Sequence, residues 1–372
     1  MHTMKLVKQS FKLSLKANVL KRLCRKRAAF WSATAFQKIL IIRYDRIGDM
    51  VVTTPLIREL RKLYPNATID VLATKTNSAV LDENKNVSNI LLYPESIIGK
   101  LVLLLRARGI YDLVIDLNHS LIWQALLELR ILKPKAIIAP KKGPRYGVDP
   151  KDLSLYDRLS EMPIDRPLAE VYLNLLKLLD GGSSALPSLS YDVPIGRTHQ
   201  RYALKALDGL EAPFYGVNIS GGRPSMSLQG RDLVRIVEAL LRKTEKGTIL
   251  LFSDPKSFGM VNSIFQESLM ASPRVSRLEP TTSVMDAVAV IEQLSILITP
   301  DTSLVHFACA KKIPLVAIYA DEQALFSHWQ PVSEAPWRVC FSKDNKSLNG
   351  YDIEEILENV NQLLESTSCK HI

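Results

Sequence analysis

The sequence has no long uninterrupted apolar segment. None of its apolar runs reaches the roughly 18 residues that a membrane-spanning helix requires, so no transmembrane helix is expected. Cysteine is also scarce: Cys24, Cys309, Cys340 and Cys369 are far apart and form no Cys-x-x-Cys motif. This spacing argues against a disulfide framework and a cysteine-based zinc site, and it fits a reducing cytoplasm.

Acidic residues are missing from the first 38 positions, which hold ten Lys or Arg. The whole chain has 48 basic and 38 acidic residues, so the remainder is balanced at 38 of each. The formal charge of +10 therefore belongs to the N-terminal segment. A nucleic-acid-binding body should carry a basic face of its own, so no nucleic-acid partner is expected.

Residues 1–36 are predicted to be a basic tail. No Pro or Gly interrupts residues 4–30, lysines recur at helical spacing on one face, and leucines recur every seven residues on another. These residues are Lys5, Lys8, Lys12 and Lys16, and Leu6, Leu13 and Leu20. Such a helix can lie on an anionic membrane surface. A disordered basic arm, or an extension with no role, is the alternative. Lysines interrupt every apolar run, which excludes a secretory signal.

Strands and helices alternate along the rest of the chain, which predicts parallel strands in doubly wound α/β sheets. Strands are expected at 38–43, 69–73, 90–93, 113–117, 136–139, 215–219, 248–252, 275–278, 296–298 and 315–319. One helix is expected after Thr54, and others at 76–84, 97–108, 121–132, 168–179, 231–243, 258–270, 284–294 and 353–364. Residues 44–49 and 141–165 are predicted loops.

The length of 372 residues and a Gly-, Ser- and Pro-rich stretch at 181–197 predict two domains. The predicted boundaries are a tail over 1–36, a Rossmann-like domain over 37–185, a linker over 186–212, a second Rossmann-like domain over 213–350 and a C-terminal helix over 351–372. Ligands are expected at the carboxyl ends of the strands, in a cleft between the domains.

The stretch 296–306, ILITPDTSLVH, joins an apolar strand to a helix. A Thr-Pro pair is expected to end the strand, and three residues that favour helix starts follow: Asp301, Thr302 and Ser303. A strand that ends in such a turn directs unpaired N–H groups and a positive dipole end at one point, which suits a diphosphate. An ordinary helix cap is the alternative.

Two motifs together resemble glycosyltransferase family nine, the lipopolysaccharide heptosyltransferases. The first, YDRIGDMVVTTPLIRELRKLYP, matches the family at Gly48, Asp49 and Pro55. The second, TPDTSLVHFACAKKIPLVAIYA, matches at Asp301, Thr302, Leu304, His306, Pro314 and Tyr319. The order of strands and helices matches from about residue 38 to residue 364.

The resemblance implies a GT-B fold, with two facing Rossmann-like domains. It implies an inverting, metal-independent transfer from a nucleotide sugar, typically ADP-heptose, to the inner core of lipopolysaccharide. The first domain would bind this glycolipid acceptor and the second the donor. No Asp-x-Asp motif or Cys/His cluster offers a metal site, and no cofactor is expected. The enzyme would work in the cytoplasm, peripherally on the inner face of the inner membrane of a Gram-negative bacterium.

Asp49 is the candidate general base, because inverting transfer needs a group that takes the proton of the acceptor hydroxyl. A loop-capping role beside Gly48 is the alternative. The candidate donor-binding residues are Arg223, Asp301, Thr302, Ser303, Leu304 and His306. For His306, a ligand contact and a core histidine hydrogen-bonded to a neighbouring strand are equally open. The candidate acceptor-binding cations are Arg46, Lys100, Arg106 and Lys142, with ordinary surface charges as the alternative.

The sequence departs from the family at three places. Ser303 stands where the family has Gly. In SGGRPSMSLQ, Met226 stands where the family has a phosphate-binding Lys, and Arg223 is the nearest substitute. Asp254 is the nearest group to a ribose-binding Glu. These departures keep two other hypotheses open, namely an inactive or scaffolding nucleotide-sugar-binding relative and a nucleotide-sugar epimerase of the same architecture.

Overall fold

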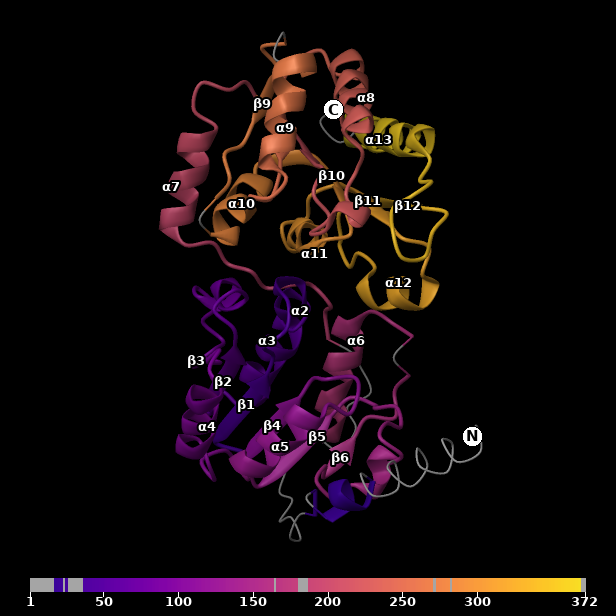
Figure 1. Ribbon diagram of the computed structural model, residues 1–372. Helices are drawn as coiled ribbons and strands as arrows, with labels where there is room; N and C mark the ends of the chain where they lie inside the picture. Colours follow the sequence, from indigo (N-terminus) through magenta and orange to yellow (C-terminus); the bar gives the residue numbers. More distant parts are fainter. Residues whose placement is uncertain are drawn as a thin grey trace, which may run out of the picture. The chain divides into compact units, whose positions relative to one another are not determined.

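The fold comes from a computed structural model. The structure describes residues 17–22, 24–25, 36–163, 165–179, 187–269, 272–281 and 283–368. Their contacts divide the chain into two units, Met1–Leu189 and Ser190–Ile372. Each unit is a six-stranded parallel sheet with helices packed on it (Figure 1).

The sheet of the first unit has the order β3-β2-β1-β4-β5-β6, and all its strand pairs are parallel. Its strands are β1 (Lys38–Ile42), β2 (Thr68–Ala73), β3 (Asn89–Leu92), β4 (Leu113–Asp116), β5 (Ala136–Ala139) and β6 (Arg158–Leu159). Strands β1 and β5 are almost wholly apolar because helices cover both faces of the sheet, so no alternation with polar residues is needed.

The helices of this unit are α2 (Ile47–Val51), α3 (Thr54–Leu63), α4 (Ile97–Arg106), α5 (Trp123–Leu132) and α6 (Leu168–Leu173). Short 3₁₀ turns are Ser78–Leu81, Pro150–Asp152 and Asn174–Leu178. Helix α3 packs beside α6 and α4 beside α5. Pro55 lies in the first turn of α3, where its missing N–H removes no helical hydrogen bond.

The sheet of the second unit has the order β12-β11-β10-β7-β8-β9, again with parallel pairs. Its strands are β7 (Phe214–Asn218), β8 (Thr248–Phe252), β9 (Val275–Arg277), β10 (Leu294–Pro300), β11 (Leu315–Tyr319) and β12 (Trp337–Phe341). Its helices are α7 (Arg197–Ala206), α8 (Gly230–Lys243), α9 (Phe258–Ile264), α10 (Val284–Ile291), α11 (Ser303–Ala310), α12 (Gln323–Trp329) and α13 (Ile353–Ser368), with a 3₁₀ turn at Pro224–Met226 and a π turn at Phe265–Leu269.

The two doubly wound α/β domains and all ten predicted strands are confirmed, but several local predictions are wrong. Residues 44–49 are not all loop, because α2 begins at Ile47. Strand β10 runs through Pro300, since a proline at the last position of a strand withholds an N–H that the ladder no longer needs. The stretch predicted as a linker contains α7. The sequence also failed to indicate β6, α12 and β12.

The end of the basic tail belongs to the first domain. Leu20 and Cys24 are each 2% exposed and pack in one core cluster with Leu104 of α4 and Leu132 of α5. Lys21 forms an ion pair of 2.9 Å with Asp152. Leu20 is therefore a core residue, and its predicted place on a free apolar stripe is wrong. Residues 1–16, with the other predicted stripe positions, lie outside the described residues.

Candidate active site

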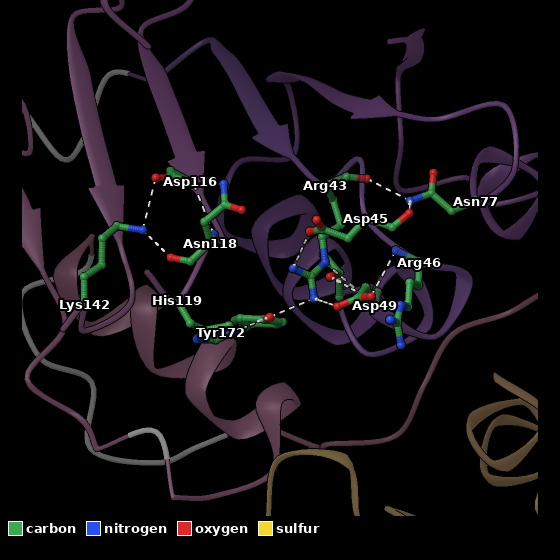
Figure 2. A network of polar contacts seen from close by, with 11 residues as sticks. Arg43, Asp45, Arg46, Asp49, Asn77, Asp116, Asn118, His119, Lys142 and Tyr172 are labelled. Carbon is green, nitrogen blue, oxygen red and sulfur yellow. Dashed lines mark hydrogen bonds and ion pairs between the residues drawn. The ribbon is translucent and has the colours of Figure 1, made fainter. Parts of the chain in front are cut away.

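Arg43 is the centre of a polar cluster at the carboxyl end of β1 (Figure 2). Its guanidinium is 2% exposed. Nη2 donates to Oδ1 of Asp49 at 2.8 Å, and Nε donates to the backbone oxygen of Asp49 at 3.1 Å. Nη1 donates to Oδ2 of Asp45 at 3.2 Å. One buried cation thus faces two carboxylates, and it compensates charge that burial would otherwise make costly.

The Asp49 carboxylate has a second fixed partner. Its Oδ2 accepts a hydrogen bond of 3.0 Å from the backbone N–H of Arg46, the residue before α2. Its side chain is 13% exposed. Asp49 therefore does cap the loop, as the alternative reading expects, and this contact holds the carboxylate in one orientation. The base role stays a prediction, and it is compatible with this contact because a carboxylate can accept about four hydrogen bonds.

Asp45 is a carboxylate in this cluster that the sequence reading missed. Its side chain is 39% exposed, three times the fraction of Asp49. Partial burial raises the pKa of Asp45, Arg43 lowers it, and the nearby charges of Asp49 and Asp116 raise it further, so the net direction is upward. Its position four residues before Asp49 was visible, but no pattern distinguished it from an exposed loop charge.

A second layer fixes this loop. Tyr172 of α6 accepts from Nη2 of Arg43 at 2.8 Å, and its hydroxyl lies 2.8 Å from Nε2 of His119. The side-chain amide of Asn77 donates to the backbone oxygens of Arg43 at 3.0 Å and Asp45 at 3.2 Å. Tyr172 reads as a core position in sequence, so only the structure indicates its polar role.

Lys142 is not available to an acceptor. Its side chain is 0% exposed and forms an ion pair of 3.1 Å with Asp116. As with Arg43, a carboxylate compensates the charge of the buried cation. It also donates to the backbone oxygen of Asn118. Burial acts to raise the pKa of Asp116, but Lys142 and the hydrogen bonds from Asn118 outweigh it and lower that pKa. This burial argues against the predicted acceptor contact of Lys142. Nothing in the local sequence distinguishes the internal lysine from its exposed neighbour Lys141.

The other candidate cations of this domain are not gathered at one point. Arg46 is exposed beside Asp49. Lys100 lies in the first half of α4 with its ammonium 4.6 Å from the centroid of the Tyr93 ring. Arg106 is the last residue of α4. A helix that follows a parallel strand runs back towards the amino edge of the sheet, so Arg106 lies away from the carboxyl ends where Asp49 is held.

In the second domain, β10 leads directly into α11, as expected. Thr302 caps the helix, with its hydroxyl oxygen accepting from the N–H of Leu304 at 3.3 Å. The amide of Leu304 therefore already has an internal acceptor. Within the described part of the chain, the backbone N–H groups of Thr302 and Ser303 have no hydrogen-bond acceptor. Two unpaired amides at the positive end of a helix form a site suited to an anion.

A buried amide supports this helix start. Asn218, at the end of β7, donates to the hydroxyl oxygen of Thr299 at 2.9 Å and to the backbone oxygen of Ser220 at 2.9 Å. The hydroxyl of Thr299 lies 3.4 Å from that of Thr302. The chain of contacts joins two neighbouring strands, β7 and β10, at their carboxyl ends. Asn218 was not predicted, although an asparagine at the end of an apolar strand is a visible signal.

The loop 220–229 is tightly folded. A side chain at Gly221 would place its Cβ 1.6 Å from the backbone oxygen of Met226, so only glycine fits there. Met226 is half-buried against the domain core, and Arg223 is exposed. Among the described residues, no hydrogen bond or ion pair involves the guanidinium of Arg223, whose backbone oxygen accepts from the hydroxyl of Ser227 at 3.1 Å. Asp254 accepts from the N–H of Ser257 at 2.7 Å, which fixes the turn before α9.

His306 lies inside the domain. It is 3% exposed, and its ring is 5.9 Å from that of Tyr191 and 5.8 Å from that of Trp329, measured between centroids. Its Nδ1 has no hydrogen-bond partner in the described structure. Burial lowers the pKa of His306 from 6.5 to about 4. The core-histidine alternative therefore fits its surroundings, although the expected hydrogen bond to a strand is absent at Nδ1.

Residues 99–357 match the family model of glycosyltransferase family 9 (heptosyltransferase). The chain belongs to glycosyltransferase family 9. It is therefore a glycosyltransferase, as the two motifs indicated. The family match covers well over half of the chain and includes the second motif.

The chain is also similar in sequence and in structure to known proteins of this family. The chain is 22% identical over 353 residues to lipopolysaccharide heptosyltransferase 3 of Escherichia coli, covering 86% of this chain and 97% of that protein. A solved family 9 glycosyltransferase from Veillonella parvula superposes with a TM-score of 0.73 at 17% identity, over 90% of this chain and 99% of that one. E. coli ADP-heptose lps heptosyltransferase II gives 0.70 at 21% identity, over 89% and 99%. These neighbours confirm the GT-B fold class.

Proposed function

We propose that this family 9 enzyme transfers a heptose from a nucleotide sugar, ADP-heptose, to the core of lipopolysaccharide. One observation carries the proposal: each family motif lies at the carboxyl end of a central strand, β1 in one domain and β10 in the other. Ligands of open parallel sheets bind at this edge. The similarity to lipopolysaccharide heptosyltransferase 3 supports the acceptor, and that to ADP-heptose lps heptosyltransferase II supports the donor.

In the proposed reaction, an acceptor hydroxyl attacks the anomeric carbon of the heptose as the bond from that carbon to the diphosphate oxygen breaks. Asp49 takes the hydroxyl proton, and the sugar configuration inverts. The fixed orientation of Asp49 between Arg43 and the amide of Arg46 supports this role, because a positioned base needs no reorganisation in the transition state. No metal ion takes part in the proposed step.

The diphosphate leaving group is proposed to lie at the start of α11. The unpaired amides of Thr302 and Ser303 would donate to its oxygens, and the exposed Arg223 would neutralise part of its charge. Asp301 and Leu304 stay candidate donor contacts, through a sugar hydroxyl and through packing at the helix start. Ser303 in place of glycine keeps the site accessible because its side chain is small.

The N-terminal tail is proposed to hold the enzyme on the cytoplasmic face of the inner membrane. Residues 1–36 carry nine Lys or Arg and no acid. Each basic residue near an anionic membrane contributes about 1 kcal/mol. Within the described residues, no helix is long and apolar enough to span a membrane. Because Leu20 and Cys24 are part of the domain core, a deletion that tests the tail must end at residue 16, not at residue 36.

The decisive experiment incubates the purified protein with ADP-heptose and lipopolysaccharide truncated in its core, and follows ADP release and the mass of the acceptor. Addition of one heptose supports the proposal, and Asp49→Asn is the matched variant that should remove it. ADP-glucose and UDP-N-acetylglucosamine serve as control donors. Absence of transfer from every donor, with the donor still bound, would instead support the inactive relative that Met226 at the Lys position favours.

A further inference from the structure

Helix α4 carries an unusual concentration of exposed apolar side chains. Among the described residues, 14 large hydrophobic side chains are exposed, and half of them lie between Leu92 and Ile110. Five belong to α4 itself: Ile97 (83% exposed), Ile98 (77%), Leu101 (45%), Val102 (41%) and Leu105 (51%). A concentration of this kind on one element indicates a surface that contacts something.

The five side chains share one face of the helix. Their spacing of i, i+1, i+4, i+5 and i+8 places them along a continuous stripe at about 3.6 residues per turn. The opposite side is the packed one, where Leu103 packs against the domain core and Ala107, directly after the helix, is 7% exposed; Leu104, 4% exposed, lies at the edge between the two sides. The helix is also well defined at its start, where Ser96 accepts from the N–H of Gly99 at 3.1 Å. The stripe is therefore an outward face of a helix already fixed to the domain.

The charges on the helix and the turn after it are positive. Residues 96–111 include Lys100, Arg106 and Arg108 and no Asp or Glu, and the exposed Glu95 stands just before the helix. Arg106 and Arg108 are exposed. In the described structure, neither Lys100 nor Arg106 forms an ion pair with a carboxylate. An apolar face beside unpaired cations is the pattern of a helix that lies in the plane of an anionic membrane surface.

We propose that α4 inserts its apolar face into the interface of an anionic lipid bilayer and is a membrane contact of the first domain. A second copy of the chain is a poorer occupant, because a symmetric pair would bring together two surfaces that each carry Lys100, Arg106 and Arg108. The choice of lipid over another protein rests on the proposed function, whose acceptor is a glycolipid. The contact is separate from the basic tail, since it uses apolar burial on an ordered helix.

The test is co-sedimentation of the full chain with vesicles of phosphatidylethanolamine and phosphatidylglycerol that contain neither donor nor acceptor. The variant Ile98→Glu/Leu101→Glu changes two exposed side chains of the stripe. The matched control, Leu204→Glu/Met260→Glu, makes the same chemical change at side chains of the second domain that are 74% and 43% exposed. We expect the stripe variant to lose roughly tenfold or more in vesicle affinity, since each lost burial of an Ile or Leu contributes about that much, and the control to bind like wild type.

A third protein, Lys8→Gln/Lys12→Gln/Lys16→Gln, separates the tail from α4. It should lose mainly the salt-sensitive part of the binding. Equal vesicle binding by the stripe variant and its control, with unchanged melting temperatures, would overturn the proposal. So would a wild-type dimer that the stripe variant dissociates while lipid binding persists, because α4 would then be an interface between copies. Binding measured without substrates stays interpretable even if no heptose transfer is found.

Discussion

The two domains hold their candidate site residues in opposite ways. In the first domain, Arg43 and Lys142 are buried, the side chain of Asp49 is 13% exposed, and each of the three has a charged partner inside the domain. In the second, the unpaired amides at the start of α11 and the exposed guanidinium of Arg223 have no hydrogen-bond or ion-pair partner within the described residues. The first arrangement fixes one side chain in one orientation, and the second leaves donors open for an anion. This difference fits a catalytic group in one domain and a binding site in the other.

Arg43→Leu should break the first arrangement most severely. Removing one member of a buried ion pair costs up to about 3–5 kcal/mol of stability, because Asp49, only 13% exposed, would lose its cation. We expect a matching fall in the free energy of unfolding, measured by urea denaturation, together with loss of transfer. Arg43→Lys is the control. It retains the charge but loses the forked geometry of the guanidinium, so its free energy of unfolding should lie between those of wild type and Arg43→Leu. A stable Arg43→Leu protein would contradict the assigned pairing.

Asp49→Asn tests chemistry with little change in volume. If Asp49 is the base, the transfer rate should fall roughly 10²–10⁴-fold while the donor dissociation constant is unchanged. Asp45→Asn is the matched control, since Asp45 shares Arg43 but does not cap α2. Rates within a few-fold of wild type for Asp49→Asn, with a large loss for Asp45→Asn, would transfer the base role to Asp45.

Arg223→Ala should weaken the binding site of the second domain without affecting the first. A hydrogen bond to a charged group is worth about 1.5–3 kcal/mol, so ADP affinity should drop about 10- to 150-fold in calorimetric titration. Met226→Lys tests whether the family's usual cation can be restored, although Met226 packs against the core. Unchanged affinity for ADP in Arg223→Ala would mean that another cation faces the phosphates.

His306→Phe should reduce the loss of stability that the protein shows at low pH. The pKa of His306 is lowered to about 4, so the folded protein keeps it neutral while the unfolded chain takes up a proton below pH 6.5. The contribution of neutral His306 to the free energy of unfolding is present above pH 6.5 and is lost as the pH falls towards 4, with about 2 kcal/mol lost by pH 5. The free energies of unfolding of wild type and variant at pH 7.5 and pH 5 measure this contribution. An equal loss in both proteins would exclude His306 as the source.

The sequence was sufficient for features that repeat or match a pattern. Ten apolar strands, their alternation with helices and the two motif positions, around Asp49 and around Thr302, were all readable. Features that depend on partners far apart in the sequence could not be predicted. Arg43 and Tyr172 meet across 129 positions, and Asp116 lies near Lys142 only because β4 and β5 are neighbours. Similarly, α4 reads as an ordinary core helix until its exposed face is seen.

The burial of Leu20 has a consequence for membrane affinity. Leu20 and Leu104 belong to the same core cluster, so the base of the tail and the inner side of α4 are parts of a single packed unit. If residues before Leu20 and the outer face of α4 both touch lipid, binding by one raises the effective concentration of the other at the surface. The overall binding constant then depends on the product of the binding constants of the two weak contacts, and not on their sum. The enzyme would be held far more firmly than either contact alone allows, yet each could still release and rebind, so that it stays on the surface while it moves between acceptors.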